Sequence, residues 1–282
     1  MKNLPNFILG GTQKSGTTFL YNLIKRHSNI EMPKRSMKHS FFDDDRVYEN
    51  GINWYMSLFN GIIKSDEIKI GQISADCSFN KGSIEKIHKH LPDTKLIFVL
   101  RHPVERTYSQ YWFMYANAAE NKNISEALKM EKIRVKKSYY NYKMYSYIGR
   151  SKYKEQFDNV YKYFNKDQVL VIPFENLVSS TLDTVNVVFD FLQIKRVNDL
   201  NDVNISSIPK NKAKLPVNDF IVQLSFNLIN IGLKRIGKKI LNKYRQEKKP
   251  PVIESDIKKW LEKELEEDIK FYEMIKINFI KL

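Results

Sequence analysis

Short apolar runs alternate with longer amphipathic segments through the first two thirds of the chain. Residues 95–100 and 169–173 are continuous apolar runs, which are typical of strands buried inside a parallel sheet. Residues 68–74 alternate between apolar and polar side chains like a short strand. Helical spacing of apolar residues occurs at 17–26, 83–90, 153–164 and 182–192. This alternation predicts an α/β fold in which helices cover both faces of a central parallel sheet.

Two further segments of this part have helical character. Residues 48–59 place Trp54, Tyr55 and Leu58 at helical spacing, and we expect these three side chains to anchor the segment in the core. Residues 125–147 are rich in charged side chains and are also expected to be helical.

The last third of the chain predicts a loop followed by helices. Between residues 195 and 218, Asn, Ser and Pro residues interrupt any helical or strand-like spacing of apolar side chains. Residues 218–244 are expected to form one helix with aliphatic side chains on one face and cations around the rest. The aliphatic positions are Ile229, Leu233, Ile236 and Ile240, and the cations are Lys234, Arg235, Lys238, Lys239 and Lys243. A solvated face on a core helix is the favoured interpretation of these cations, and contact with an anionic acceptor or a membrane surface is the alternative. After two prolines, Ser255 is expected to cap a final helix that runs to Tyr272.

The stretch at residues 7–20 has the pattern of a phosphate-binding loop. An apolar strand turns through Gly10 and Gly11 and enters a helix, so that backbone N–H groups at the helix start can point at an anion. Gly11, four residues and Gly16 match the first part of the nucleotide-triphosphatase loop, in which Lys and then Ser or Thr should follow. Here Thr17 follows instead, and a lysine stands inside the loop at position 14. The pattern therefore favours a phosphate site over its alternative, a glycine turn before an ordinary surface helix.

A second candidate anion site follows the apolar run at 95–100. Arg101 stands at the expected carboxyl end of a central strand, where open α/β sheets collect ligands. Pro103 suits the first turn of a helix, and Ser109 would lie about two turns further on. A guanidinium with a nearby hydroxyl suits a terminal phosphate. The alternative is that Arg101 only ends the strand and Ser109 is an ordinary helix-surface serine.

The two patterns together resemble those of one family. Lys14-Ser-Gly-Thr-Thr is similar to the 5′-phosphosulfate loop of sulfotransferases that use 3′-phosphoadenosine 5′-phosphosulfate (PAPS). Arg101-x-Pro-x-x-Arg-x-x-Ser-x-Tyr resembles the 3′-phosphate site of the same family. The stretches at 41–43, 51–55, 148–153 and 174–177 are most similar to its carbohydrate (heparan-sulfate-type) and bacterial branch. The resemblance covers residues 5 to 194.

This resemblance implies a P-loop-like fold and transfer of a sulfuryl group from PAPS to a hydroxyl or amine. The desulfated nucleotide, 3′-phosphoadenosine 5′-phosphate (PAP), would be the second product. The acceptor would be a carbohydrate or another bacterial metabolite, and no metal would be needed. Residues 1–282 would form a single sulfotransferase domain, with a PAPS-binding α/β core at 1–194 and a loop and helical C-terminal extension at 195–282. Lys14 would neutralise the charge on the departing bridging oxygen. The donor-binding residues would be Lys14, Ser15, Gly16, Thr17 and Thr18 at the 5′ end, and Arg101 and Ser109 at the 3′ end.

The chain departs from the family pattern at two places. The family's catalytic glutamate usually precedes the Phe-Phe pair by three residues, and Lys38 stands there. His39 is beside it and is the candidate general base, because an imidazole titrates near neutral pH. The alternatives are that His39 is a surface residue and that the base is Asp43, Asp76 or absent. Ile73 occupies the position of a second lysine of the family, which helps catalysis there. Lys38 could supply the missing positive charge as a catalytic group.

Composition sets outer limits on the function. The 282 residues carry a net charge of +15, which favours anionic partners without choosing among them. Cys77 is the only cysteine, so we expect no disulfide, no thiolate metal cluster and a cytoplasmic protein. No run reaches the ~18 apolar residues of a membrane helix, and residues 1–5 leave no room for a signal peptide. We expect an acceptor substrate as the partner and no nucleic acid, while peripheral membrane contact and the oligomeric state stay open. The competing hypotheses are a P-loop kinase or NTPase and a non-catalytic binder of acidic polymers.

Overall fold

The computed structural model describes residues 4–33, 41–62, 67–203 and 214–279. The chain divides into two compact units. Unit 1 comprises residues 1–102, 153–208 and 267–282, and unit 2 comprises residues 103–152 and 209–266. That residues 1–282 act as one domain stays a prediction.

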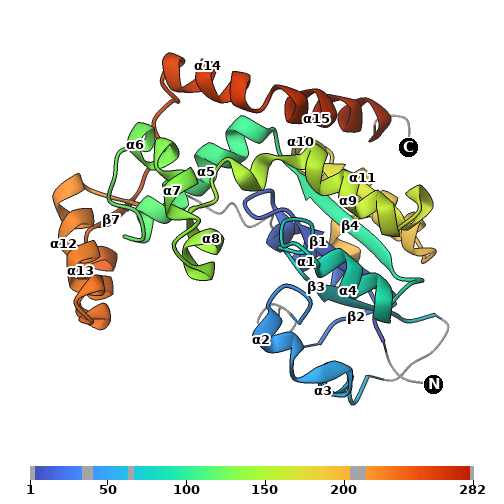
Figure 1. Ribbon diagram of the computed structural model, residues 1–282. Helices are drawn as coiled ribbons and strands as arrows, with labels where there is room; N and C mark the ends of the chain where they lie inside the picture. Colours follow the sequence, from blue (N-terminus) through green and yellow to red (C-terminus); the bar gives the residue numbers. More distant parts are fainter. Residues whose placement is uncertain (1–3, 34–40, 63–66, 204–213, 280–282) are drawn as a thin grey trace. The chain divides into compact units, whose positions relative to one another are not determined.

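Unit 1 contains a parallel five-stranded sheet, which confirms the predicted fold class (Figure 1). Its strand order is β2-β3-β1-β4-β5. The strands are β1 Phe7–Gly11, β2 Ile30–Glu31, β3 Lys69–Ile73, β4 Lys95–Leu100 and β5 Val169–Pro173. The two continuous apolar runs therefore became β4 and β5, and β4 lies beside β1 with Phe7 opposite Lys95 and Gly11 opposite Phe98.

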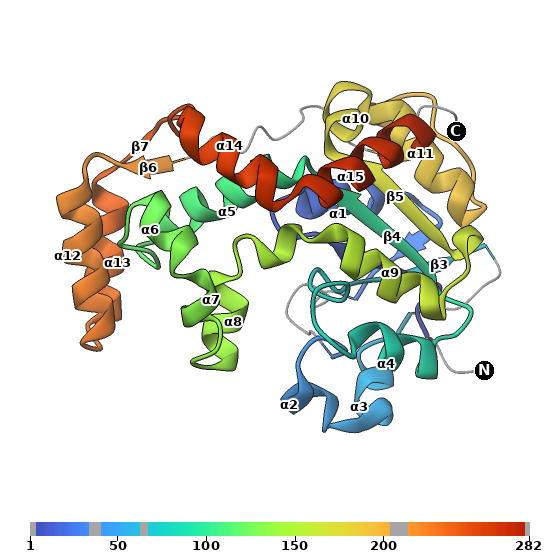
Figure 2. The ribbon, with the colours of Figure 1, turned by 45° about the horizontal axis from the view of Figure 1, so that its top comes forward.

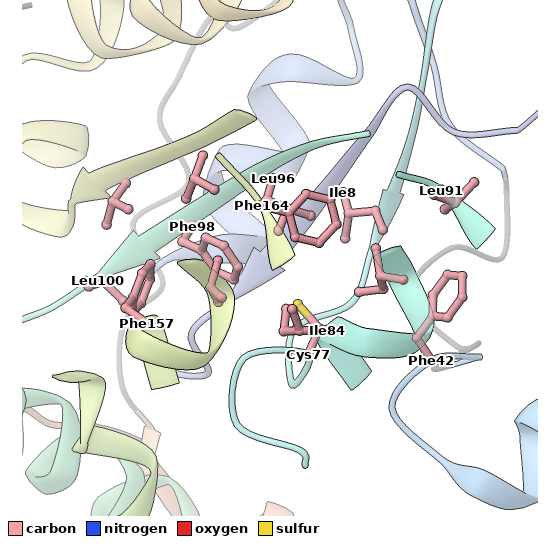
Figure 3. Packing of buried hydrophobic residues seen from close by; sticks show 14 of the residues in the cluster. Ile8, Phe42, Cys77, Ile84, Leu91, Leu96, Phe98, Leu100, Phe157 and Phe164 are labelled. Atoms are coloured by element: carbon pink, nitrogen blue, oxygen red, sulfur yellow. The ribbon is translucent and has the colours of Figure 1, made fainter. Parts of the chain in front are cut away.

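Each central strand sends alternate side chains into two separate apolar cores. Phe7 and Leu9 of β1 pack into one cluster and Ile8 into the other. The first cluster contains side chains from helices α1 Thr17–Ile24 and α11 Thr181–Leu192. The second contains side chains from α4 Ser83–His90 and α9 Tyr153–Tyr163 and surrounds Phe98 (Figure 3). Helices thus cover both faces of the sheet, as predicted.

The last helix of the chain belongs to the second of these cores. α15 Glu266–Phe279 is the C-terminal helix drawn in red in Figure 2, and it buries Tyr272 in this core. Its Phe271 ring lies 5.3 Å from that of Phe157 on α9. The Asp268 carboxylate accepts a hydrogen bond of 2.9 Å from the backbone N–H of Lys154 in the first turn of α9. The predicted helical C-terminal region is present, and its final helix is built into the α/β core.

The remaining elements are divided between the two units. Unit 1 also holds α2 Asp45–Tyr48, α3 Gly51–Ser57 and α10 Phe174–Ser179. The helices of unit 2 are α5 Pro103–Ala116, α6 Ile124–Lys129, α7 Glu131–Arg134, α8 Tyr139–Tyr145, α12 Asp219–Asn230, α13 Lys234–Lys243 and α14 Ser255–Glu264. An antiparallel pair joins β6 Lys214–Pro216 to β7 Arg245–Glu247. The 3-10 helices are η1 Gly149–Ser151, η2 Lys166–Gln168 and η3 Leu200–Val203.

The expectation of long unbroken helices was wrong at several places. Residues 48–59 break into α2 and α3 at Gly51, which has φ 80°. Residues 218–244 form two helices, because Gly232 at φ 89° reverses the chain. Residues 125–147 form three helices, and Ser255 begins α14 while Glu254 occupies its cap position. Of the expected anchors Trp54, Tyr55 and Leu58, only Tyr55 is fully buried, and the other two pack partly buried against the same core.

His27, just after α1, is held as a neutral imidazole. Its Nε2 lies 2.9 Å from the Lys195 carbonyl oxygen, which only a donor can satisfy, and its Nδ1 accepts a hydrogen bond of 3.1 Å from the backbone N–H of Asn29. The ring centroid is 4.4 Å from that of Phe189. Burial lowers the pKa of His27, and the hydrogen bond to Lys195 opposes this in part.

Because its folded-state pKa is lowered, His27 takes up a proton more readily in the unfolded chain. Its contribution to stability is therefore present above about pH 6.5 and lost as the pH falls toward the lowered value. We expect the melting temperature of His27→Gln to fall less between pH 7.5 and pH 5.5 than that of the wild type. Scanning calorimetry at both pH values measures this, with His88→Gln as the control for removing an imidazole. An unchanged pH dependence in His27→Gln would contradict the assignment.

Candidate functional site

The glycine loop lies at the carboxyl edge of the sheet. It leaves β1 at Gly11, where φ is 113° and a β-carbon would stand 2.2 Å from the carbonyl oxygen of Ala75. At Gly10 a β-carbon would stand 2.3 Å from the Phe98 ring. Only glycine fits between these neighbours, so the two glycines bring the loop backbone tight against β4 and the residues that follow β3.

Thr12 organises the inside of the loop. Its N–H donates to the Val99 carbonyl at 2.8 Å, and its own carbonyl accepts from the Ser15 N–H and the Thr17 hydroxyl, both at 3.2 Å. The hydroxyls of Thr12 and Ser15 are hydrogen-bonded at 2.7 Å, and the Ser15 side chain is fully buried. The side chains of Ser15 and Thr17 therefore stabilise the loop from within, whereas Thr18 is exposed.

The loop has the backbone geometry of an anion site. Lys14 has φ 72° and Gly16 has φ 90°, so two left-handed residues flank Ser15. Such alternation turns successive N–H groups toward one concave side. Gly16 is the N-cap of α1. The N–H groups of Thr17 and Thr18 lie in the first turn of that helix, where the helix itself offers them no carbonyl acceptor. The arrangement can hold a phosphate through backbone N–H groups and the positive end of the helix dipole.

Phe174, the first residue of α10, touches both predicted anion-binding elements of unit 1. A β-carbon on Gly16 would stand 2.8 Å from its ring. The guanidinium carbon of Arg101 lies 5.3 Å from the centroid of the same ring, and the Arg101 carbonyl accepts a hydrogen bond of 2.9 Å from the Tyr153 hydroxyl. Arg101 and the glycine loop therefore both lie beside the same aromatic side chain, which the sequence did not indicate.

Ser109 lies in the second turn of α5, and Pro103 opens this helix as predicted. The second arginine of the motif, Arg106, is completely buried. It donates to the Ser151 hydroxyl at 2.5 Å, to the Gln110 side-chain oxygen at 2.7 Å and to the Tyr147 carbonyl. Arg106 is therefore a structural side chain that ties α5 to residues 147–151, while Ser109 is half-buried on the same helix.

The candidate bases fall in different places. Lys38 and His39 lie outside the described residues. Asp43 is buried, accepts a hydrogen bond of 2.7 Å from the Ser74 hydroxyl at the end of β3, and its carbonyl accepts one of 2.7 Å from Asn80. Asp76 is less buried than Asp43. Burial, with the Asp43 charge as a further cause, raises the pKa of Tyr55 and of the Cys77 thiol, which therefore stays protonated.

The acidic run after the Phe-Phe pair does not converge on one point. Asp44 caps α2 through the Arg46 N–H, and Asp45 forms an ion pair with Lys86. Within the part of the chain that the structure describes, no three His, Cys, Asp or Glu side chains come close enough together to hold a metal ion.

Unit 2 contains an aromatic cavity that the sequence analysis missed. It measures about 280 Å³, and α5 contributes Tyr108, Tyr111, Trp112 and Tyr115 to its wall. These residues have the spacing of one helical face, which is the signal that could have revealed it. The Tyr111 hydroxyl donates to the Lys122 carbonyl at 3.0 Å, and the Tyr115 hydroxyl donates to Asp219, so the rings are held in place.

Curated proteins of known activity are similar to parts of the chain. Over 121 residues it is 36% identical to the membrane-associated sulfotransferase kil1 of Dictyostelium discoideum, covering 43% of this chain and 25% of that protein. Over 204 residues it is 28% identical to the human heparan sulfate glucosamine 3-O-sulfotransferase 6, covering 70% and 54%. The chain thus spans about half or less of the length of these relatives.

Solved structures and a family model complete the comparison. A sulfotransferase from Alicyclobacillus acidocaldarius superimposes with a TM-score of 0.61 at 23% identity, over 86% of this chain and 95% of that one. Mouse sulfotransferase SULT7A1 complexed with PAP gives 0.53 at 15% identity, over 99% and 89%. Both confirm the P-loop-like fold. The family model described as a sulfotransferase domain matches residues 4–221, which is most of the chain. The chain therefore belongs to the sulfotransferase domain family.

Proposed function

We propose that the chain transfers a sulfuryl group from PAPS to a hydroxyl or amine of a carbohydrate acceptor. The observation that carries this proposal is the family match over residues 4–221, combined with a phosphate loop whose backbone geometry suits an anion at residues 14–18. The PAP complex of the mouse structural neighbour supports PAPS as the donor. The heparan sulfate enzymes among the relatives support a carbohydrate as the acceptor.

The residues would divide the work between positioning and charge stabilisation. The N–H groups of Gly16, Thr17 and Thr18 would hold the 5′-phosphate, with the Thr18 hydroxyl as a further donor. Arg101 and Ser109 are the proposed ligands of the 3′-phosphate. In the transfer, an acceptor oxygen or nitrogen forms a bond to sulfur, while the bond from sulfur to the bridging phosphate oxygen breaks. Lys14 would neutralise the charge that develops on this leaving oxygen.

His39 is the proposed acceptor of the proton that leaves the nucleophile, with Lys38 as an additional charge. Asp43 is a poorer candidate, because its side chain is 3% exposed and already accepts the hydrogen bond from Ser74. Asp76 is the stronger carboxylate alternative, since it is more accessible.

The proposed location is cytoplasmic, which the free, buried thiol of Cys77 supports. Among the described residues, no helix is long and apolar enough to cross a bilayer. No nucleic-acid partner is proposed.

Replacing Lys14 by Ala tests the proposed charge neutralisation. We expect turnover to fall about 100-fold or more, as for loss of one preorganised donor to a developing oxyanion. PAP release with a heparan-type oligosaccharide acceptor measures it. Lys14→Arg should recover part of the activity, and Lys25→Ala, at the end of α1, should leave it unchanged. Full activity in Lys14→Ala would remove this residue from the mechanism.

Gly16 and Gly82 allow a matched test of the phosphate loop. Both are N-cap residues with φ near 90°, at 90° and 81°, but only a β-carbon at Gly16 meets another residue. Alanine at either position costs roughly 1 kcal/mol of backbone strain, so both variants should melt a few degrees lower. Saturating PAP should raise the melting temperature of the wild type and Gly82→Ala equally, and that of Gly16→Ala much less. Mg-ATP should stabilise none of them as PAP does; stabilisation by Mg-ATP alone would favour a kinase.

The general base can be identified from the pH dependence of kcat. A base must be unprotonated, so with His39 in this role kcat should fall as the pH drops below about 6.5. His39→Ala should lower kcat by about 100-fold or more and abolish the fall of kcat at acidic pH. Asp76→Asn should keep the wild-type kcat and the same fall at acidic pH. The reverse result would assign the role to Asp76.

A further inference from the structure

The α12–α13 hairpin presents large aliphatic side chains to solvent at its turn. We define the hairpin tip as residues 231–238, which join the end of α12 to the start of α13 (Figures 1 and 2). Ile231 is 70% exposed, Leu233 44% and Ile236 50%. An isolated exposed aliphatic side chain needs no explanation, but three within six residues form an apolar patch.

The internal packing of the hairpin does not use these three side chains. Val222 and Leu241 are buried between the helices with Ile221 and Ala118. At Gly237 the helices approach so closely that a β-carbon would stand 2.8 Å from the Ser225 carbonyl oxygen. The turn itself is closed by backbone hydrogen bonds, with the Leu233 N–H donating to the Leu228 carbonyl at 2.8 Å. The hairpin is therefore held by other residues, and the exposed patch is free for an external contact.

The same tip carries a concentration of positive charge. Residues 220–246 contain no Asp or Glu and six cations. These cations are Lys234, Arg235, Lys238, Lys239, Lys243 and Arg245. All except Arg245 are exposed, and Arg245 donates to the Ala116 carbonyl. The surface at the start of α13 is hollowed, with Leu233, Lys234, Arg235, Ile236 and Lys238 in its wall.

The combination of charge and apolar surface selects one class of partner. Cations alone would suit any polyanion, including a sulfated glycan. Three exposed aliphatic side chains among them add nothing to binding a sulfated glycan, because such a chain presents charges and hydroxyls. A membrane offers phosphates for the cations and, a few ångströms deeper, hydrocarbon for the aliphatic groups.

We propose that the hairpin tip docks the protein on an anionic lipid surface, with Ile231, Leu233 and Ile236 entering the headgroup layer and the neighbouring cations binding lipid phosphates. This contact is peripheral and independent of the sulfuryl transfer proposed above. It gives a use to the aliphatic positions Leu233 and Ile236, which the sequence analysis expected on a buried face.

Co-sedimentation of the full chain with vesicles tests this docking. We expect binding to vesicles of phosphatidylcholine with about 30% phosphatidylglycerol, because the surface charge of the anionic lipid attracts the cations, and weak binding to phosphatidylcholine alone. The aliphatic variant Ile231→Ser/Leu233→Ser/Ile236→Ser should weaken binding at least about tenfold. The charge variant Lys234→Gln/Arg235→Gln/Lys238→Gln should also weaken it, at about fivefold per cation.

Matched controls separate the tip from general surface effects. Val178→Ser/Ile277→Ser removes aliphatic groups that are 52% and 56% exposed elsewhere, and Lys248→Gln/Lys249→Gln removes two other exposed cations. Both should bind vesicles like the wild type. Each variant's melting temperature reports folding, and the single change Ile231→Asp serves as the second aliphatic test should the triple variant unfold.

Two outcomes would overturn the proposal. One is wild-type vesicle binding by the folded aliphatic variant or, if that variant unfolds, by Ile231→Asp, because the contact would then not use the aliphatic side chains. In that case the wild type and the aliphatic variant would be retained equally on a heparin column and the charge variant less, which would identify a polyanion-binding surface. The other is equal binding of the wild type to charged and uncharged vesicles.

Discussion

The close approach of the residue 10–16 backbone to its neighbours is the constraint on which the candidate site depends. Gly11 lies against the Ala75 carbonyl, and Gly16 lies against the Phe174 ring. Because neither contact leaves room for a side chain, the loop can take few other paths between β1 and α1. The Thr12 carbonyl accepts two hydrogen bonds from within the loop and so restricts the loop backbone further. An anion that binds here meets N–H groups that need little reorganisation, and preorganised donors are the more effective for catalysis.

Within unit 2, buried charged side chains rather than glycine contacts hold α5, the helix that bears Ser109, against the residues around it. Arg106 on α5 is satisfied by three acceptors, and the fully buried Glu120 pairs with Arg134 at 2.5 Å and accepts from the Tyr147 hydroxyl at 2.7 Å. Glu131 accepts the backbone N–H groups of Ile148 and Gly149. Removing one partner from such a buried group typically costs 3–5 kcal/mol, about ten times a surface ion pair. These contacts therefore hold α5 and residues 147–151 as one body.

Strands β1, β3, β4 and β5 could be predicted from the sequence, whereas the two-residue β2, the short β6–β7 pair and the side-chain assignments could not. An apolar run such as 95–100 indicates burial on both faces, which only a central strand satisfies. Gly51 and Gly232 were visible as helix breakers, but glycine is tolerated inside a helix at a cost of about 1 kcal/mol, so pattern alone did not decide. Arg106 resembles an anion ligand in sequence, and its burial depends on acceptors that come 41 to 45 residues later. The contact of Phe174 with both Gly16 and Arg101 depends on chain segments even further apart.

The surplus positive charge of the chain is partly localised, and its location limits what it can do. Residues 220–246 contribute six positive charges and no negative one to a net charge of +15. The proposed donor site uses only Lys14 and Arg101, so donor binding does not account for this excess. At physiological ionic strength the Debye length is about 8 Å, and exposed cations attract little beyond that range. Lysines on α13 would therefore act on what touches the hairpin, which makes a contact surface the more economical explanation than long-range steering of an acceptor.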